Sequence, residues 1–207
     1  MQELPQLQSR LYEAVAWNHD GEAIAELVRE GAQVDYVHPS YGHTALHNAC
    51  KCDRPRAIEM LLKHGADPNR RFTYRSPVDE RVEADRVALH YVSSADAAAV
   101  LISAGADVNV ADATGTTPLM CAAFHSHTDV VRAFLAAGAS PLARQQKRRG
   151  RKAHTARELT ESKIEFFREA IRQAVADKNR ETAERRLQCY EEIRDILLEA
   201  ESRVVAA

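Results

Sequence analysis

The feature that most constrains the fold is a Gly-Ala dipeptide that occurs four times along the chain at nearly even spacing. The four copies begin at Gly31, Gly65, Gly105 and Gly138, so successive glycines are 34, 40 and 33 residues apart. Recurrence of this kind indicates stacked repeats, because a short unit cannot bury its apolar side alone and needs neighbours on either side. The sequence therefore predicts an elongated stack that shares one continuous core.

The segment from Gly42 to Asp67 shows what one unit contains. Two groups of apolar residues at helical spacing are separated by a polar turn, and they are Leu46, Ala49 and Cys50, then Ile58, Leu61 and Leu62. We expect the hydroxyl of Thr44 to cap the first helix by accepting a backbone N–H. Gly65 is expected to end the second helix in the left-handed conformation that a residue without Cβ adopts easily. Each unit is thus helix, turn, helix and loop.

Opening tetrapeptides recur in register with these closing glycines. They are Thr44-Ala45-Leu46-His47, Val87-Ala88-Leu89-His90 and Thr117-Pro118-Leu119-Met120. Leu46 precedes Gly65 by nineteen residues, and Leu119 precedes Gly138 by the same distance. A TPLH-like opening with a period of about 33 residues resembles the ankyrin repeat family.

The resemblance covers roughly residues 10 to 160 and implies an all-α solenoid of four to five repeats. We divide the chain into an ankyrin repeat domain, 1–160, and a C-terminal helical extension, 161–207. Leu11–Gly31 is expected to be a first repeat that lacks the opening tetrapeptide. In this family the His of the tetrapeptide ties neighbouring backbone through its ring, so this tie should be missing at Met120.

The third unit departs from the family pattern. The segment Asn69–Arg86 is longer than an ankyrin loop, and Leu89 precedes Gly105 by only sixteen residues. We expect the three missing residues to come from the turn around Ser93 to Asp96.

The C-terminal part is predicted to be helical, because no Gly follows Gly150 and no Pro follows Pro141. His154-Thr155-Ala156 is similar to a fifth opening. Two apolar stripes that differ in phase indicate two helices with a break near Asp177 to Arg180. The first should complete a fifth repeat, and the second should pack on it or on a partner.

Some ankyrin stacks are followed by a SOCS box, a helical segment that recruits a ubiquitin ligase scaffold. Cys189 and Ile193 have the spacing of that box, but Arg185 stands where a Leu is expected and no proline-containing element follows. These departures argue against a SOCS box.

Charge and composition restrict where the chain acts. The net charge of −2 gives no global attraction to nucleic acid, and no apolar run approaches the ~20 residues of a spanning helix. Residues 1–20 lack the pattern of a secretory signal, and four sparse cysteines suit a reducing compartment. We expect a cytoplasmic protein without membrane insertion. The basic segment Lys147–Lys152 is either a nuclear import signal or a solvated loop.

A stack of this kind offers an open groove rather than an enclosed cavity, which favours a protein partner over a small-molecule substrate. An offset of five residues from the tetrapeptide Leu, or its equivalent, places Trp17, Lys51, Ser94 and Phe124 at the groove, with His125 beside them. We take Trp17, Lys51, Phe124 and His125 as candidate binding residues. For Trp17 the alternative is that it covers the N-terminal end of the stack.

The insertion supplies a second group of candidates, which interleaves arginines with aromatic residues: Arg70, Arg71, Phe72, Tyr74 and Arg75. Such a mixture suits contacts to carboxylates and ring stacking with a protein partner. It also suits single-stranded nucleic acid, which we consider the weaker interpretation. The alternative is a solvated loop in which Phe72 packs against the core.

No pattern indicates catalysis, a cofactor or a metal. His47, Cys50 and Cys52 lack a fourth ligand nearby, and His47 has a structural role in the family pattern. We therefore expect a non-catalytic interaction module or adaptor. The alternative is a structural subunit of a larger assembly that docks through its C-terminal helices.

Overall fold

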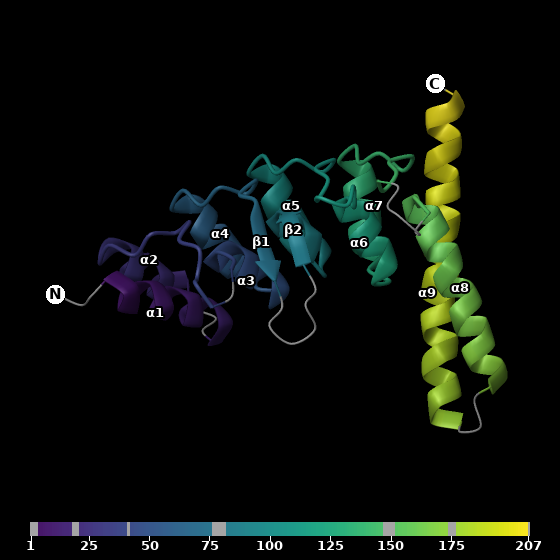
Figure 1. Ribbon diagram of the computed structural model, residues 1–207, viewed down its shortest axis with the longest axis horizontal. Helices are drawn as coiled ribbons and strands as arrows, with labels where there is room; N and C mark the ends of the chain where they lie inside the picture. The colour runs from purple at the N-terminus through teal and green to yellow at the C-terminus, as the bar shows by residue number, and fades with distance from the viewer. Residues whose placement is uncertain are drawn as a thin grey trace.

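The computed structural model describes residues 4–17, 21–40, 42–75, 82–146, 152–173 and 177–206. Within these residues the chain forms a row of helix pairs that ends in two long helices (Figure 1). The first four pairs are α1 (Leu4–Trp17) with α2 (Gly21–Arg29), α3 (Ala45–Lys51) with α4 (Pro55–Lys63), η1 (Ala88–Tyr91) with α5 (Ala95–Ser103), and α6 (Pro118–Phe124) with α7 (Thr128–Ala136). The row ends with α8 (Ala156–Gln173) and α9 (Asp177–Ala206). The prediction of an all-α repeat solenoid is confirmed.

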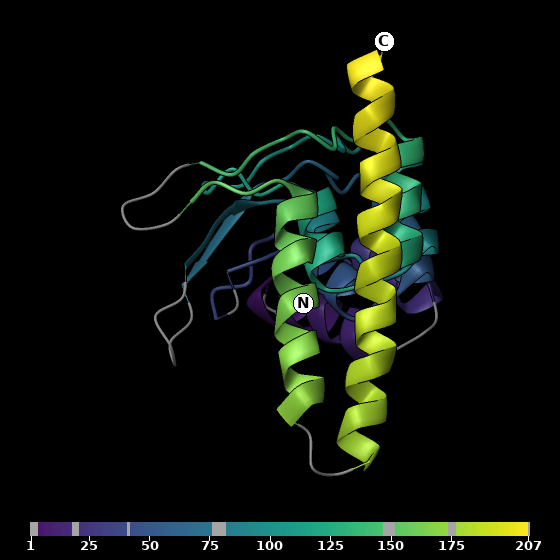
Figure 2. The ribbon, with the colours of Figure 1, turned by 90° about the vertical axis from the view of Figure 1, so that its right-hand side faces the viewer.

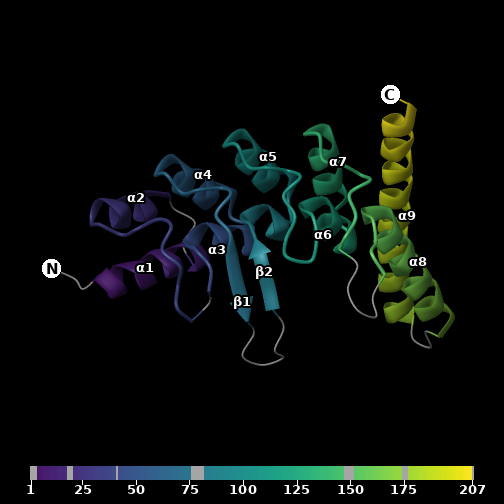
Figure 3. The ribbon, with the colours of Figure 1, turned by 45° about the horizontal axis from the view of Figure 1, so that its top comes forward.

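The pairs stack through like positions. The first helix of each pair contacts the next first helix, from α1 through α3, η1 and α6 to α8. The second helices contact each other in the same way, from α2 through α4, α5 and α7 to α9 (Figure 3). The long final helices therefore take the places of a fifth pair, and position 160 lies inside α8.

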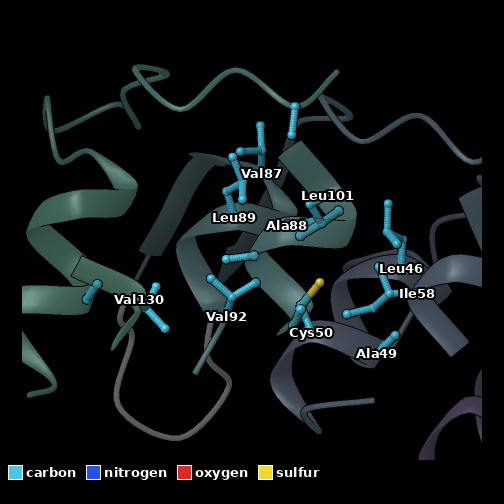
Figure 4. Packing of buried hydrophobic residues seen from close by; sticks show 14 of the residues in the cluster. Leu46, Ala49, Cys50, Ile58, Val87, Ala88, Leu89, Val92, Leu101 and Val130 are labelled. Carbon is cyan, nitrogen blue, oxygen red and sulfur yellow. The ribbon is translucent and has the colours of Figure 1, made fainter. Parts of the chain in front are cut away.

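The core runs through the stack as one continuous band, and Figure 4 shows its central part. Leu46 and Ile58 of the second repeat are fully buried, as is Leu101 of the third. Each such side chain contributes about 1.5–3 kcal/mol relative to an exposed one, so stability is the sum of successive interfaces between repeats.

Helix ends follow the prediction at the glycine and depart from it at the threonine. Gly65 adopts a φ of +88°, and the next residue, Ala66, donates back to the carbonyl of Leu61 at 3.0 Å. Thr44 forms no side-chain cap, because its hydroxyl bonds His47 Nδ1 at 2.8 Å instead. The expected cap is therefore wrong at Thr44.

The tetrapeptide histidines are buried, and one of them ties the repeats as the family pattern implies. His90 Nε2 donates to the carbonyl of Thr116, in the loop before the next repeat, at 3.0 Å. Met120, at the same position of the fourth repeat, is buried as an apolar residue. His47 Nε2 forms no hydrogen bond within the described residues, although the backbone of Arg70 favours its protonated form.

The third repeat is short because its first helix is short. Whereas α3 has seven residues, η1 is a single turn of four, so the deletion falls in the helix and not only in the turn after it. The preceding insertion forms a two-stranded antiparallel hairpin of β1 (Phe72–Arg75) and β2 (Val82–Arg86), which the sequence did not predict. A bulge interrupts its register between Phe72 and Tyr74.

Two helices after the fourth repeat were predicted, and two are present. Since α9 already begins at Asp177, the expected break at Asp177 to Arg180 is placed a few residues too late. The predicted apolar stripe of the last helix is confirmed where Ile193 and Leu197 are fully buried.

Candidate protein-binding surface

The first helices line one side of the stack, which the ankyrin resemblance implies is the concave side, and Lys51 lies there at the end of α3. Its side chain is exposed, and Nζ lies 4.9 Å from the centroid of the Tyr91 ring. The guanidinium carbon of Arg86 lies 5.6 Å from the same centroid. Two cations thus share one aromatic ring, an arrangement that electrostatic attraction to the ring face stabilises.

Sequence reasoning missed Tyr91 for a definite reason. The five-residue offset selects Ser94 in the third repeat, but η1 ends three residues earlier than α3 does. Tyr91 therefore occupies the end of this first helix, and Ser94 caps the next helix by accepting from the backbone N–H of Ala97. Counting the deletion inside the helix would have found Tyr91.

Phe124 and His125 lie at the end of α6, as the offset predicted. Phe124 is 39% exposed, and Lys163 Nζ lies 3.9 Å from its ring centroid. The His125 ring meets Phe124 edge-on at 5.2 Å, and His127 stacks on His125 at 6.1 Å. Burial lowers the pKa of both imidazoles, so both rings are neutral at pH 7.

The insertion candidates separate into exposed and buried residues. Arg70 is exposed. Arg71 is also exposed, but its Nη1 donates to the carbonyls of Asp85 at 3.2 Å and Ala111 at 3.1 Å, so it holds the hairpin to the next loop.

Phe72 is only 5% exposed and packs between rings of the second and third repeats. Its centroid lies 4.5 Å from that of His47 and 5.7 Å from that of Tyr91. The expected partner contact by Phe72 is therefore wrong, and the alternative, that Phe72 packs against the core, is confirmed. The side chains of Trp17, Tyr74 and Arg75 lie outside the described residues.

A polar hollow of about 500 Å³ lies between the third and fourth repeats. It lies between the beginnings of α5 and α7, where Ser94 and His127 precede the two helices. Asp53 is bonded to the hydroxyl of Ser94 there, and its charge favours the protonated form of His127.

The described residues contain no group of three or more His, Cys, Asp or Glu placed to hold a metal ion. None of the helices in this part of the chain is long and apolar enough to cross a bilayer. Cys50 and Cys121 are buried, and Cys52 and Cys189 are half-buried.

Comparison with known proteins agrees with the geometry. A family model described as ankyrin repeats, in three copies, matches residues 6–72 and 76–145. The chain is 36% identical over 100 residues to "Ankyrin repeat and SOCS box protein 6" of Mus musculus, which covers 47% of this chain and 22% of that protein. The human protein of the same name is 35% identical over 121 residues, covering 55% of this chain and 27% of the relative.

A further relative is the human "2-5A-dependent ribonuclease", which is 41% identical over 51 residues, 25% of this chain and 7% of that protein. The chain thus spans about a quarter or less of the length of these curated relatives. Because the family model covers more than half of the chain, in register with the observed repeats, the chain belongs to the ankyrin repeat family.

Proposed function

We propose that this chain is a non-catalytic adaptor that binds a protein partner along its concave side. Ankyrin repeats are generally protein interaction modules. The observation that most supports this role here is a row of exposed or half-buried side chains from three successive repeats. Lys51, Tyr91 and Phe124 each end the first helix of their repeat. A partner segment lying across the repeats would meet all three.

The chemistry of this row suits a protein partner. Aromatic and cationic side chains dominate the energetics of protein interfaces, and truncating a central one costs about 2 kcal/mol or more. Tyr91 and Phe124 are held by packing against Lys51, Arg86 and Lys163, so little side-chain freedom remains to be lost on binding.

Paired variants test the role of the row. Partners are captured with the full chain and with Lys51→Glu and Phe124→Asp, and quantified by mass spectrometry. We expect recovery of specific partners to fall about tenfold or more in both variants. Lys63→Glu is the control, because Lys63 is exposed on the second helix of the same repeat. Equal recovery by all four proteins would refute the proposal. Arg71→Glu is unsuitable, because it also breaks the contacts that hold the hairpin.

A second candidate is a structural subunit that docks through its last helices. Leu198, Val204 and Val205 of α9 are exposed, and a hollow of about 650 Å³ lies between α7 and the end of α9. Removing α8 and α9 would not test this proposal, because the loss of Ile193 and Leu197 would expose the core that these side chains cover. The double variant Leu198→Asp, Val205→Asp keeps the fold; loss of a native assembly in this variant alone would favour the subunit.

We also propose a cytoplasmic location, with nuclear import through Lys147–Lys152 as the alternative. Only Lys152 of that segment lies within the described residues, and it is exposed. Two fluorescent fusions decide between these locations, one of the unchanged chain and one whose basic residues in this segment are changed to Ser. Import is supported only if the fluorescence of the first is nuclear and that of the second is cytoplasmic.

A further inference from the structure

The last two helices extend well beyond the repeat on which they pack. While α6 has seven residues, α8 has 18, which corresponds to roughly 10 Å and 27 Å of helix. Figure 1 shows the lower half of α8 and the beginning of α9 below the end of α6, and in Figure 2 the lower ends of both helices extend beyond the repeats. This projecting pair meets the end of α6 at Phe124.

Four aromatic residues gather at this junction, which we call the aromatic corner: the rings of Phe166, Phe167 and Tyr190 contact one another in a chain, and Tyr190 reaches the backbone of Phe124. The hydroxyl of Tyr190 donates to the backbone carbonyl of Phe124 at 2.7 Å. Phe167 stacks on Tyr190 with centroids 5.5 Å apart, and Phe166 meets Phe167 edge-on at 5.3 Å. The corner thus joins the fourth repeat to both long helices.

Two rings of the corner face solvent while the other two are held beneath them. Tyr190 is buried and Phe167 is half-buried, whereas Phe124 is 39% and Phe166 is 63% exposed. An exposed Phe that touches a second, fixed aromatic ring is already ordered, and covering it releases water without further side-chain ordering. This environment suits contact with a partner better than that of a scattered surface residue does.

Ion pairing on the last two helices leaves two cations without a carboxylate partner among the described residues. Every described carboxylate on α8 and α9 forms an ion pair with an arginine, and the arginines concerned are Arg132, Arg144, Arg157, Arg168, Arg172, Arg180, Arg185, Arg194 and Arg203. Among the described lysines and arginines of these two helices, only Lys163 and Arg186 form no ion pair. Lys163 covers the ring of Phe124, and Arg186 lies one turn before Tyr190.

Both cations without a carboxylate partner therefore lie at the aromatic corner, Lys163 at Phe124 and Arg186 near Tyr190. We propose that the aromatic corner is a docking site for an acidic segment of a partner protein that carries a large apolar side chain. The apolar side chain covers Phe166 and the open edge of Phe124, and carboxylates on either side pair with Lys163 and Arg186. A basic segment would place its charges against these two cations. The site shares Phe124 with the concave row but is otherwise formed by α8 and α9.

Single-stranded nucleic acid also binds aromatic rings flanked by cations, but the surroundings of Phe166 argue against it. Glu165 and Glu169 lie on either side of Phe166 along α8, and their charges would face a phosphate backbone. A protein segment can place its few carboxylates at Lys163 and Arg186 alone, whereas a phosphate backbone carries charge at every step.

Selection from a random 12-residue peptide library displayed on phage, against the full chain, tests the proposal. Enriched peptides are then synthesised and their affinities measured by fluorescence anisotropy. We expect a family of peptides with net negative charge and at least one Phe, Trp, Leu or Met. Their binding should weaken about thirtyfold in Phe166→Ser and about fivefold in Arg186→Glu, the range for an anchor and a flanking charge.

Matched controls keep the result specific. Arg185→Glu reverses a neighbouring charge that is paired with Glu181, and Leu198→Ser removes another exposed apolar side chain of α9; both should bind as the unchanged chain does. Lys51→Glu separates the two surfaces. Peptides that respond to Lys51→Glu but not to Phe166→Ser are ligands of the concave row, and a selection that yields only these overturns the present proposal while supporting the proposed function.

Other results would also overturn it. Enriched peptides that are basic, or that bind Phe166→Ser as tightly as the unchanged chain, contradict the assigned chemistry. Sedimentation that shows a dimer lost in Phe166→Ser would mean that a second copy covers the corner. Binding of a labelled 20-nucleotide poly-uridine that depends on Phe166 would assign the corner to nucleic acid.

Discussion

The buried ring of His47 makes the stability of the stack depend on pH. His47 is fully buried, its Nδ1 bonds the hydroxyl of Thr44 at 2.8 Å, and its ring packs against Phe72. Burial, together with the neighbouring His43, lowers the pKa of His47 from 6.5 to about 3. In the unfolded chain the same ring takes up a proton near its ordinary pKa.

The sign and size of the effect follow from linkage. Between about pH 6.5 and pH 3 the unfolded chain holds a proton on residue 47 that the folded chain does not, so acidification favours unfolding. Each pH unit in this window costs about 1.4 kcal/mol. Lowering the pH from 7 to 5 should therefore reduce the free energy of unfolding by about 2 kcal/mol through this ring alone.

Urea unfolding at pH 7 and pH 5, followed by circular dichroism, measures the effect in the unchanged chain, in His47→Gln and in Thr44→Val. His47→Gln removes the titrating ring, so its pH-dependent loss should be about 2 kcal/mol smaller. Thr44→Val breaks the same hydrogen bond but keeps the buried ring, so it should lower stability and retain the pH dependence. An equal loss in His47→Gln and in the unchanged chain would refute the reasoning.

Three further outcomes follow from individual contacts. The side-chain amide of Asn109 donates to the carbonyl of Gly138 and accepts from the backbone N–H of Ser140, so it holds the next loop. Asn109→Ala should therefore lower the free energy of unfolding by about 1–2 kcal/mol in urea titrations. Tyr190→Phe loses the hydroxyl that holds α9 to α6 and should cost about 1 kcal/mol by the same measurement, with an unchanged circular dichroism spectrum. In the folded chain a thiol reagent should label Cys52 well before Cys50, because Cys50 is fully buried and burial raises the pKa of its thiol, and mass spectrometry of partly labelled protein checks the order.

The regular repeats could be predicted because their signals are local. Gly65 ends a helix where only a residue without Cβ is unstrained, and the spacing from Leu46 to Gly65 is that of one complete pair. Thr44 shows the limit of such local rules. A buried His three residues on competes for its hydroxyl, and the tertiary contact wins over the cap.

The third repeat could not be predicted in detail because its deletion and its insertion compensate in three dimensions. The hairpin β1–β2 places Phe72 against the rings beside the shortened η1, so an apparently exposed aromatic residue becomes part of the core. The offset rule likewise passes over Tyr91. A count along the chain assumes equal helices, and here one helix is a single turn.

The position of the candidate residues along the fold could be predicted only where one repeat supplies them. Phe124 and His125 lie in the regular fourth repeat, and the structure places both at the end of α6 as expected. Lys163, which lies against Phe124, is 39 residues further along the chain, and no periodicity connects the two positions. Contacts between repeats and a following helix pair depend on how the helices are placed in space.

The stability of the stack does not explain why the last two helices are so long. A terminal unit needs an apolar inner side and a polar outer side, and α8 and α9 have both, with Ile164, Ile193 and Leu197 buried and their carboxylates paired at the surface. Covering α6 and α7 requires helices of seven and nine residues, yet these helices have 18 and 30. The surplus length instead carries an exposed ring, Phe166, and Arg186, which forms no ion pair within the described residues, to the junction with the fourth repeat, where the proposed docking site lies.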